Sequence, residues 1–362
     1  VSPMQMIVSS FFAVIAFGTL MLMMPFATYD GEITFINALF TATSATCVTG
    51  LVVYDTFTKF TIFGKCVIIT MIQVGGLGLV TFTTFFSMVL GRRLGLHSLK
   101  LASENSNTSS FAQMRTFINK VMKITFTCEG IGMLLLCCVL VPKFGLSGIP
   151  MSAFTAISAF CNAGFDLFGF LGQYSSLTTF SGNPFILGVI SALIISGGLG
   201  FIAWQEILAY RKTKKFSLHS KLVFLITGIL IVSGTVLFAL LEWHNTKTIG
   251  TMGFFDKISN SMFQSISART AGFNSVDLAS ASDMTKMVMS VLMFIGTAPG
   301  GTGGGIKVTT IAILVVTVIS VIRGRDETTI FGRQIDKKIV YRSLAITMLG
   351  AGAVVCAILA VF

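Results

Sequence analysis

Charged residues are scarce in this sequence. Asp, Glu, Lys and Arg make up 11% of the 362 residues, whereas soluble domains contain about 25%. The seven cysteines form no CxxC pair, and the three histidines are far apart in the chain, so their spacing predicts neither a metal centre nor a redox motif. Apolar residues account for 54% of the chain, and its mean hydropathy is +0.87. This composition excludes an ordinary soluble domain and predicts an all-α polytopic membrane protein surrounded by lipid.

Long apolar segments recur along the chain. Crossing the hydrocarbon core takes about 20 helical residues, and segments suited to this lie near 6–26, 63–90, 118–141, 184–209, 222–242, 286–320 and 340–362. Three shorter apolar stretches each run into a small-residue segment with a glycine, and they are 33–46, 151–161 and 257–268. Because these stretches are too short to cross, we predict re-entrant helices that enter the membrane part-way and return.

The basic residues are distributed unevenly between the two sides of the membrane. When the seven spans alternate, 17 of the 25 Lys and Arg residues fall on one side, Lys307 lies within a span, and the opposite side receives only Lys59, Lys65, Lys143, Lys247, Lys257, Arg269 and Lys286. Positive residues favour the cytoplasmic side. We therefore predict a cytoplasmic N-terminus, with the re-entrant helices entering from outside.

The segments form repeated units. The re-entrant stretches are followed by "TCVTGL", "CNAGF" and "RTAGF", and the next spans carry "QVGGLGLVTF", "SGGLGFIAW" and "GGTGGGIKVTT". The unit is a span, a re-entrant pore helix, a glycine strand and a second span. We predict pore repeats at 1–95, 96–215 and 216–335, with 336–362 as the first span of a fourth. The chain stops abruptly in "GAVVCAILAVF" and looks cut short.

The glycine strands are candidates for an ion-selective filter. Irregular backbone at membrane depth must line water or be buried in protein, and carbonyl rings can replace the hydration shell of a potassium ion. Gly50, Gly164 and Gly272 are the expected ion-binding glycines, because glycine reaches the backbone angles needed. The other candidate filter residues are Thr46, Cys47, Val48, Thr49, Cys161, Asn162, Ala163, Arg269, Thr270 and Ala271.

Acidic residues follow each strand. Asp55, Asp166 and Asp277 could raise the cation concentration at an outer mouth, although an ordinary solvated role is an equal alternative. Arg269 is expected to pair locally with an acid. Glu129 lies inside a span, where an ionisable group is a functional candidate.

Another glycine-rich stretch interrupts the span near 286–320. "GTAPGGTGGGIKVTT" is close to a phosphate-binding loop, but Ile306 separates Gly305 from the lysine, and the preceding segment reads as a helix instead of the strand that such a loop follows. We therefore predict no ATP site and no enzyme. Glycine and Pro299 disfavour helix here, so we predict a movable gate composed of Gly296, Thr297, Ala298, Pro299, Gly300, Gly301, Thr302, Gly303, Gly304 and Gly305. Lys307 is counted with this gate: it either anchors the loop or interacts with a cytoplasmic partner, and the alternative is that its side chain only extends the amine to water.

The repeated "TCVTGL / CNAGF / RTAGFNSVD" pattern, with "IQVGGLG" and "GGGIKVTT", resembles the Trk/Ktr/HKT superfamily of potassium transporters over essentially the whole chain. It is most similar to the bacterial Ktr membrane subunits. The resemblance implies four units around a pore, each with one filter glycine, and a small-residue intramembrane loop below the filter in the third unit. The fourth filter strand and last span are missing from this sequence.

The resemblance also implies potassium uptake across the bacterial cytoplasmic membrane, with sodium coupling left open. It implies a homodimer on a cytoplasmic nucleotide-binding regulatory ring of the KtrA type. No cofactor is expected in this chain, nucleotide is expected only on the partner, and no nucleic acid is expected. An alternating-access carrier for sodium or another small solute is the alternative, but it would predict inverted repeats, whereas these repeats all enter from one side.

Overall fold

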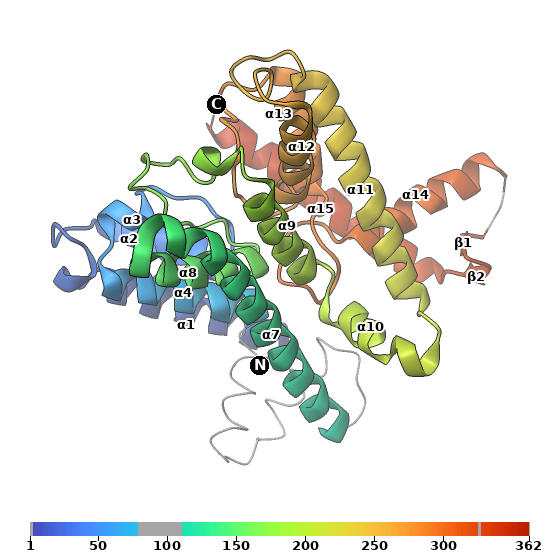
Figure 1. Ribbon diagram of the computed structural model, residues 1–362. Coiled ribbons are helices and arrows are strands. Elements are labelled where there is room, and N and C mark those ends of the chain that lie inside the picture. The colour runs from blue at the N-terminus through green and yellow to red at the C-terminus, as the bar shows by residue number, and fades with distance from the viewer. Residues whose placement is uncertain (1–2, 79–110, 325–326, 362) are drawn as a thin grey trace.

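The computed structural model describes residues 3–78, 111–324 and 327–361, and their fold is helical (Figure 1). Strands within this part of the chain are confined to one antiparallel hairpin, β1 (Thr329–Ile330) with β2 (Arg333–Gln334). The predicted all-α architecture is confirmed. The division into repeats at the boundaries given above stays a prediction.

The N-terminal part contains α1 (Pro3–Leu22), η1 (Pro25–Ala27), α2 (Phe35–Thr46), α3 (Thr56–Lys59) and α4 (Ile62–Leu77). Helix α2 corresponds to the first predicted re-entrant stretch and begins at Thr34, whose hydroxyl accepts a hydrogen bond from the Asn37 amide; such a cap satisfies a free N–H group of the first turn. The second half of the predicted span 63–90 and the basic link with Arg92, Arg93 and Lys100 lie outside the described residues.

The central part contains α7 (Phe111–Phe144), η2 (Gly145–Ser147), α8 (Gly148–Phe160), η3 (Thr178–Phe180), α9 (Pro184–Gly198) and α10 (Phe201–Thr213). Helix α8 corresponds to the second predicted re-entrant stretch. The segment 184–209, predicted as one span, instead forms α9 and α10, which meet at an angle of 98°. The break lies at Leu199 and Gly200, where Gly200 adopts a φ of +84°, a conformation that ends a regular helix.

The C-terminal part contains α11 (Leu218–Glu242), α12 (Phe254–Ser267), α13 (Asp283–Phe294), α14 (Val308–Ile322) and α15 (Lys337–Val361). Helix α12 corresponds to the third predicted re-entrant stretch. The predicted span 286–320 is interrupted between α13 and α14, at the glycine-rich stretch.

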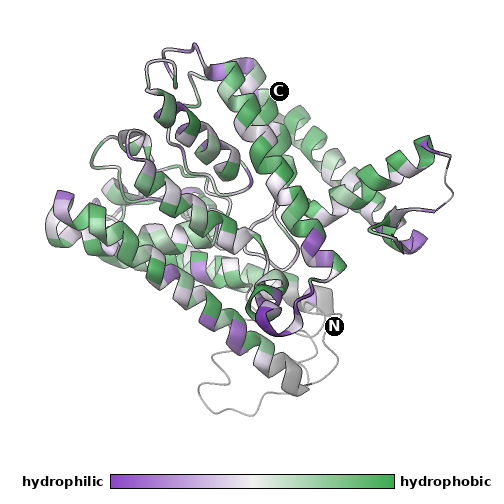
Figure 2. Ribbon diagram, turned by 45° about the vertical axis from the view of Figure 1, so that its right-hand side comes forward, coloured by the Kyte–Doolittle hydropathy of each residue, from purple (hydrophilic) through white to green (hydrophobic). Residues whose placement is uncertain are grey.

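Three helical stretches of the described chain are long and apolar enough to cross a membrane, namely Thr116–Phe160, Leu218–Glu242 and Lys337–Ala360. The bent pair α9 and α10 would make a fourth, and Val8–Leu22, Ile62–Leu77 and Val308–Ile322 are apolar but shorter. Hydrophobic residues predominate along most of the helices (Figure 2). Large apolar side chains such as Phe12 and Leu240 are more than two-thirds exposed, as expected of a surface in contact with lipid.

The three predicted re-entrant helices all contribute to the main hydrophobic core. The main hydrophobic core draws buried residues from α2, α8 and α12, among them Ala42, Phe154 and Phe263. It also includes Ala163 and Ala271 of the glycine strands. The glycine strands, predicted to be irregular backbone at membrane depth, are therefore enclosed by protein at these two residues. Irregular backbone is tolerated within a membrane when it is buried in protein in this way.

Candidate ion pathway

The three predicted filter glycines come together. A Cβ atom placed on Gly50 would lie 2.8 Å from the Ala163 carbonyl oxygen and 3.5 Å from the Gly164 Cα. One placed on Gly164 would lie 2.6 Å from the Ala271 carbonyl oxygen and 3.0 Å from the Gly272 Cα. Segments more than a hundred residues apart therefore meet backbone to backbone. Neither Gly50 nor Gly164 has room for a Cβ atom, whereas at Gly272 the left-handed φ of +80° is what disfavours a side chain.

The strands share a backbone pattern as well as a glycine. The glycines have φ of +78° at Gly50, +72° at Gly164 and +80° at Gly272. Two residues earlier, Val48, Asn162 and Thr270 also have positive φ, at +56°, +58° and +75°. Left-handed backbone is rare for a β-branched residue such as valine or threonine and implies strain held by the surroundings. Sequence reasoning missed this second position, because its three residues differ and only asparagine commonly adopts that conformation.

Each strand is fastened to the helix that precedes it. The Thr49 amide donates to the Ser44 carbonyl at 2.9 Å, and the Ala163 amide donates to the Ser158 carbonyl at 2.8 Å. In the third unit the Ala271 amide closes a shorter turn on Ser267, at 2.9 Å. These bonds engage carbonyls of the last helical turn, whose negative end then faces the strands.

The "GGLG" stretches pack against the ends of the pore helices. A Cβ atom on Gly75 would lie 1.9 Å from the Thr46 carbonyl oxygen, and one on Gly197 would lie 1.8 Å from the Phe160 carbonyl oxygen. Thr46 and Phe160 are the last residues of α2 and α8. These glycines are close packing points, and each contacts the predicted pore helix of its own unit.

The second strand is also linked to a buried carboxyl group. The Cys161 thiol lies 3.8 Å from Gln73 Oε1, and Gln73 Nε2 donates to Glu129 Oε1 and Oε2 at 3.0 and 3.3 Å. Glu129 is 6% exposed. This intramembrane carboxyl thus orients an amide behind the strand, and all seven cysteines are free thiols.

Arg269 departs from its predicted environment. Its side chain is buried, and its Nε has no hydrogen-bond partner. Within the described residues the ion pairs are Lys59 with Asp30 and Lys286 with Asp283, so the expected acidic partner of Arg269 is not among them. Acidic residues lie near Arg269 in the sequence, but none of them forms an ion pair with it in the described structure.

The three predicted outer-mouth aspartates differ in environment. Asp55 is buried, and its carboxylate accepts hydrogen bonds from the Phe57 and Thr58 amides, so it is a helix cap more than a free surface charge. Asp277 is exposed, and hydrogen bonds from Ser280 and Ala279 lower its pKa. Burial, together with the charge of Asp55, raises the pKa of Asp166 to about 6.

The predicted gate segment is a closed loop without helix. The Gly296 amide donates to the Ile306 carbonyl at 3.0 Å, and the Ile306 amide donates to the Phe294 carbonyl at 3.1 Å. A Cβ atom on Gly296 would lie 1.9 Å from the Gly304 carbonyl oxygen. The two ends of the loop therefore lie against each other, so that the loop projects from the break between α13 and α14.

The loop is held by the break between α9 and α10. The Ala298 amide donates to Gly198 at 3.0 Å, and the Phe201 amide donates to Gly300 at 2.9 Å. The Thr302 hydroxyl donates to the Phe160 carbonyl at 2.8 Å, which connects the loop to the end of pore helix α8. Lys307 Nζ donates to the Gly303 carbonyl at 2.7 Å, so the lysine anchors the loop by direct contact. The loop therefore lies against the end of α8, next to the start of the second strand.

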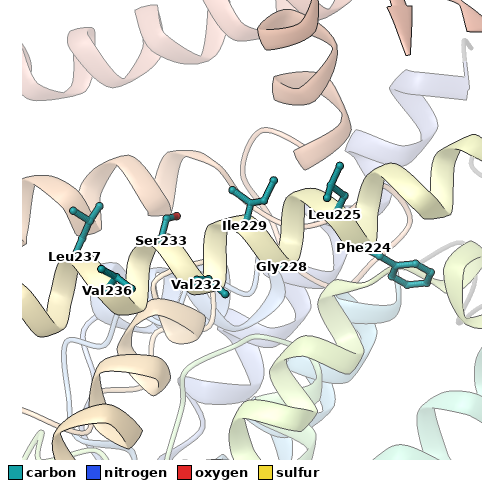
Figure 3. Close-up of a pocket in the computed structure, with 8 residues that line it drawn as sticks. All are labelled: Phe224, Leu225, Gly228, Ile229, Val232, Ser233, Val236 and Leu237. Atoms are coloured by element: carbon teal, nitrogen blue, oxygen red, sulfur yellow. The ribbon is translucent and has the colours of Figure 1, made fainter. Parts of the chain in front are cut away.

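A separate groove of about 780 Å³ lies along the outside of α11 (Figure 3). Its lining is apolar except for Ser233 and the backbone at Gly228, and includes Ile229 and Val232. A cation path needs oxygen ligands or charge, so this groove is a lipid-type surface and no part of the pathway.

Comparison with known proteins identifies the family. The family model described as TrkH, a cation transport protein, matches residues 2–362. The chain is 39% identical over 350 residues to the Ktr system potassium uptake protein B of Bacillus subtilis (strain 168), covering 96% of this chain and 77% of the relative. It is 37% identical over 360 residues to the potassium/sodium uptake protein NtpJ of Enterococcus hirae, covering 99% and 78%.

The fold agrees with this assignment. The crystal structure of the potassium transporter TrkH from Vibrio parahaemolyticus matches 93% of this chain and 68% of its own, with a TM-score of 0.65 and 16% identity. At that identity the match shows a shared fold. Together with the family model and the two relatives above, it shows that the chain belongs to the TrkH family of cation transport proteins.

Proposed function

We propose that this chain is a pore-forming subunit for potassium uptake across the cytoplasmic membrane. The observation that carries the proposal is the meeting of Gly50, Gly164 and Gly272. Each follows a half-length helix whose C-terminal half is largely buried, and each belongs to a strand with the same pair of left-handed residues. Repeated left-handed turns orient carbonyl groups alike, and such groups can replace the hydration shell of a dehydrated potassium ion. Two relatives whose names state potassium or potassium/sodium uptake support the same ion class.

Cation preference also follows from the helices. Helices α2, α8 and α12 end at the strands, and the C-terminal end of a helix carries partial negative charge. Such an arrangement favours a cation over an anion at the meeting point. We favour potassium over sodium as the transported ion because the filter positions are glycine. Sodium is the competing ion in the test described below.

The loop Gly296–Gly305 is the proposed gate. It lies against the end of α8 through Thr302 and is anchored by Lys307. Because it lacks helix and has few side chains, its contacts are a small set of hydrogen bonds that can be exchanged at low cost. The similarity to the Ktr system potassium uptake protein B supports a homodimer regulated by a cytoplasmic nucleotide-binding ring. The proposed contact with this ring is the basic end of α10, with Lys212 and Lys214.

Ion uptake by the full-length protein in liposomes tests this function. Vesicles loaded with potassium, in a medium low in potassium, should accumulate a rubidium tracer, and external potassium should compete far better than external sodium. Deleting Gly300–Gly305 should raise uptake if the loop is the gate. Equal competition by sodium would refute potassium selectivity, and unchanged uptake after the deletion would refute the gate.

A further inference from the structure

Residues 169–177 connect the second unit to the other two units just beyond the glycine strands. This segment, which we call the cross-strand segment, begins five residues after Gly164 and lies between α8 and α9. Among the described residues, no backbone hydrogen bond joins the strands 46–50, 161–164 and 269–272 to one another. The separation of the strands therefore depends on packing and on contacts made beyond them.

On one side the cross-strand segment holds the continuation of the first strand. The Tyr174 hydroxyl donates to the Val53 carbonyl at 2.9 Å, and the Tyr174 amide donates to Asp55 Oδ2 at 3.3 Å. Gly169 packs directly on the same carboxylate, because an added Cβ atom would lie 1.9 Å from Asp55 Oδ1. Val53 and Asp55 follow Gly50 by three and five residues, so these contacts act on the chain that leads out of the strand.

On the other side the cross-strand segment holds the continuation of the third strand. The Asn274 amide donates to Ser176 Oγ at 3.2 Å, and the Leu177 amide donates to the Asn274 carbonyl at 2.9 Å. Ser176 is 8% exposed, and Asn274 lies two residues after Gly272. One short segment of the second unit is thus hydrogen-bonded to both of the other units.

The backbone of the cross-strand segment is strained at the residues that make these contacts. Tyr174 has a φ of +59° and Ser176 a φ of +47°. Residues with a side chain rarely adopt positive φ, and the strain persists only where the surroundings impose it. Backbone strain of this kind gathers at functional sites, and a plain connection between α8 and α9 would not need it.

We propose that Tyr174 and Ser176 are positioning residues for ion selectivity, and this rests on the proposed filter. They hold the first and third strands at fixed distances from the second. Selectivity of a carbonyl filter depends on the size of the cavity and on the carbonyl oxygens around the ion. Strands that can move towards each other fit the smaller sodium ion better, so loss of either hydrogen bond lowers the preference for potassium.

Two substitutions remove one side-chain hydrogen bond each. Tyr174→Phe removes the hydroxyl that binds the first unit, and Tyr341→Phe is its control because Tyr341 is exposed on α15. Ser176→Ala removes the acceptor that binds the third unit. Its matched control is Ser175→Ala, since the neighbouring Ser175 hydroxyl has no hydrogen-bond partner within the described structure.

Competition of external potassium and sodium against rubidium uptake, by the full-length protein in liposomes, measures the preference. Tyr174→Phe and Ser176→Ala should each lower the ratio of the sodium to the potassium half-inhibitory concentration about fivefold, the factor for one hydrogen bond of ordinary net strength. Both controls should keep the wild-type ratio. Loss of folded protein would lower uptake without changing this ratio, so the ratio separates positioning from stability.

Amide hydrogen exchange of peptides that contain Asn274 tests the contact itself. In Ser176→Ala the Asn274 amide should exchange about fivefold faster than in the wild type, whereas Ser175→Ala should leave its exchange unchanged. Wild-type exchange in Ser176→Ala would show that this hydrogen bond does not hold the third strand, and would overturn the inference for Ser176.

The competition assay separates this inference from the proposed function. If the wild type prefers potassium and both Tyr174→Phe and Ser176→Ala keep its ratio, the positioning role is overturned and the proposed function stands. A lower ratio in one variant assigns the role to that residue alone. A wild type without a preference for potassium would refute the proposed function, and this inference with it.

Discussion

Lys307 Nζ donates a hydrogen bond to the carbonyl oxygen of Gly303, 2.7 Å away. Lys307 directly precedes α14, and a positive charge at a helix N-terminus is electrostatically unfavourable. Its contact with the loop offsets this cost, and in the proposed gate this contact is what keeps the loop closed. Lys307→Met should therefore raise potassium uptake by about tenfold, the factor for a hydrogen bond from a charged donor.

Uptake of rubidium tracer into liposomes measures this effect. Lys221→Met is the matched control, because Lys221 is exposed on α11 and should leave uptake unchanged. If Lys307→Met matched the control, the amine would have no part in closing the loop.

Gly75 is predicted to be intolerant of any side chain. An added Cβ would lie 1.9 Å from the Thr46 carbonyl oxygen, so Gly75→Ala must displace the end of α2 and the first filter strand. We expect loss of potassium selectivity, or loss of folded protein when the displacement is not absorbed. Gly188→Ala, in α9, meets no atom within 4 Å and should be neutral in size-exclusion profile and in potassium-to-sodium competition. Normal selectivity in Gly75→Ala would contradict the close contact.

Uptake should depend on external pH through Asp166. This residue lies between α8 and α9, outside the spanning helices, and burial with the nearby charge of Asp55 raises its pKa to about 6. Asp166 therefore binds its proton more tightly in the native state than in the unfolded chain, where its pKa has the ordinary value near 4. The free energy of unfolding accordingly increases as the pH falls from above 6 towards 4. Over the same range the carboxylate charge is lost, and cation attraction at the mouth weakens.

We expect uptake to fall about threefold between pH 7.5 and pH 5, the effect of one charge several ångströms from the ion path. Asp166→Asn should give low uptake at both pH values. Asp277→Asn should retain the pH dependence. The pKa of Asp277 is lowered, so in the wild type this carboxylate stays charged from pH 7.5 to pH 5 and does not contribute to the change in uptake. Persistence of the pH response in Asp166→Asn would assign it to another group.

Glu242 is predicted to stabilise the fold and to have no direct role in ion transport. It is fully buried, and its Oε1 accepts from the Ser282 amide at 2.9 Å while its Oε2 accepts from Asn245 and Thr248, both at 2.7 Å. This carboxylate at the end of α11 therefore fixes the start of α13. Glu242→Gln turns one acceptor into a donor and should destabilise the protein by about 2 kcal/mol, measured as a lower apparent melting temperature. Glu327→Gln, at an exposed site, should leave it unchanged.

Repetition made the meeting of the three strand glycines predictable from the sequence. Gly50, Gly164 and Gly272 each follow a short apolar stretch, and three occurrences in order are informative where one is not. The left-handed residues Val48 and Thr270 were not predictable, because no residue preference points to them and the surrounding fold imposes the conformation.

Other features were not predictable from the apolar and acidic patterns of the sequence. Asp55 was expected at an open mouth, but its local hydrogen bonds made it a cap. The bend between α9 and α10 was missed because the apolar pattern of 184–209 is continuous. The bond from Thr302 to Phe160 spans 142 positions, and no local pattern reveals such a pairing.

Three glycine strands are proposed to form one potassium-selective path. Potassium-to-sodium competition of tracer uptake tests this in the full-length protein with Gly50→Ser, Gly164→Ser or Gly272→Ser, compared with Gly182→Ser in open space. Each filter substitution should lower the preference for potassium, whereas Gly182→Ser should retain it. Unchanged preference in all three filter variants, with uptake intact, would show that these strands do not select the ion.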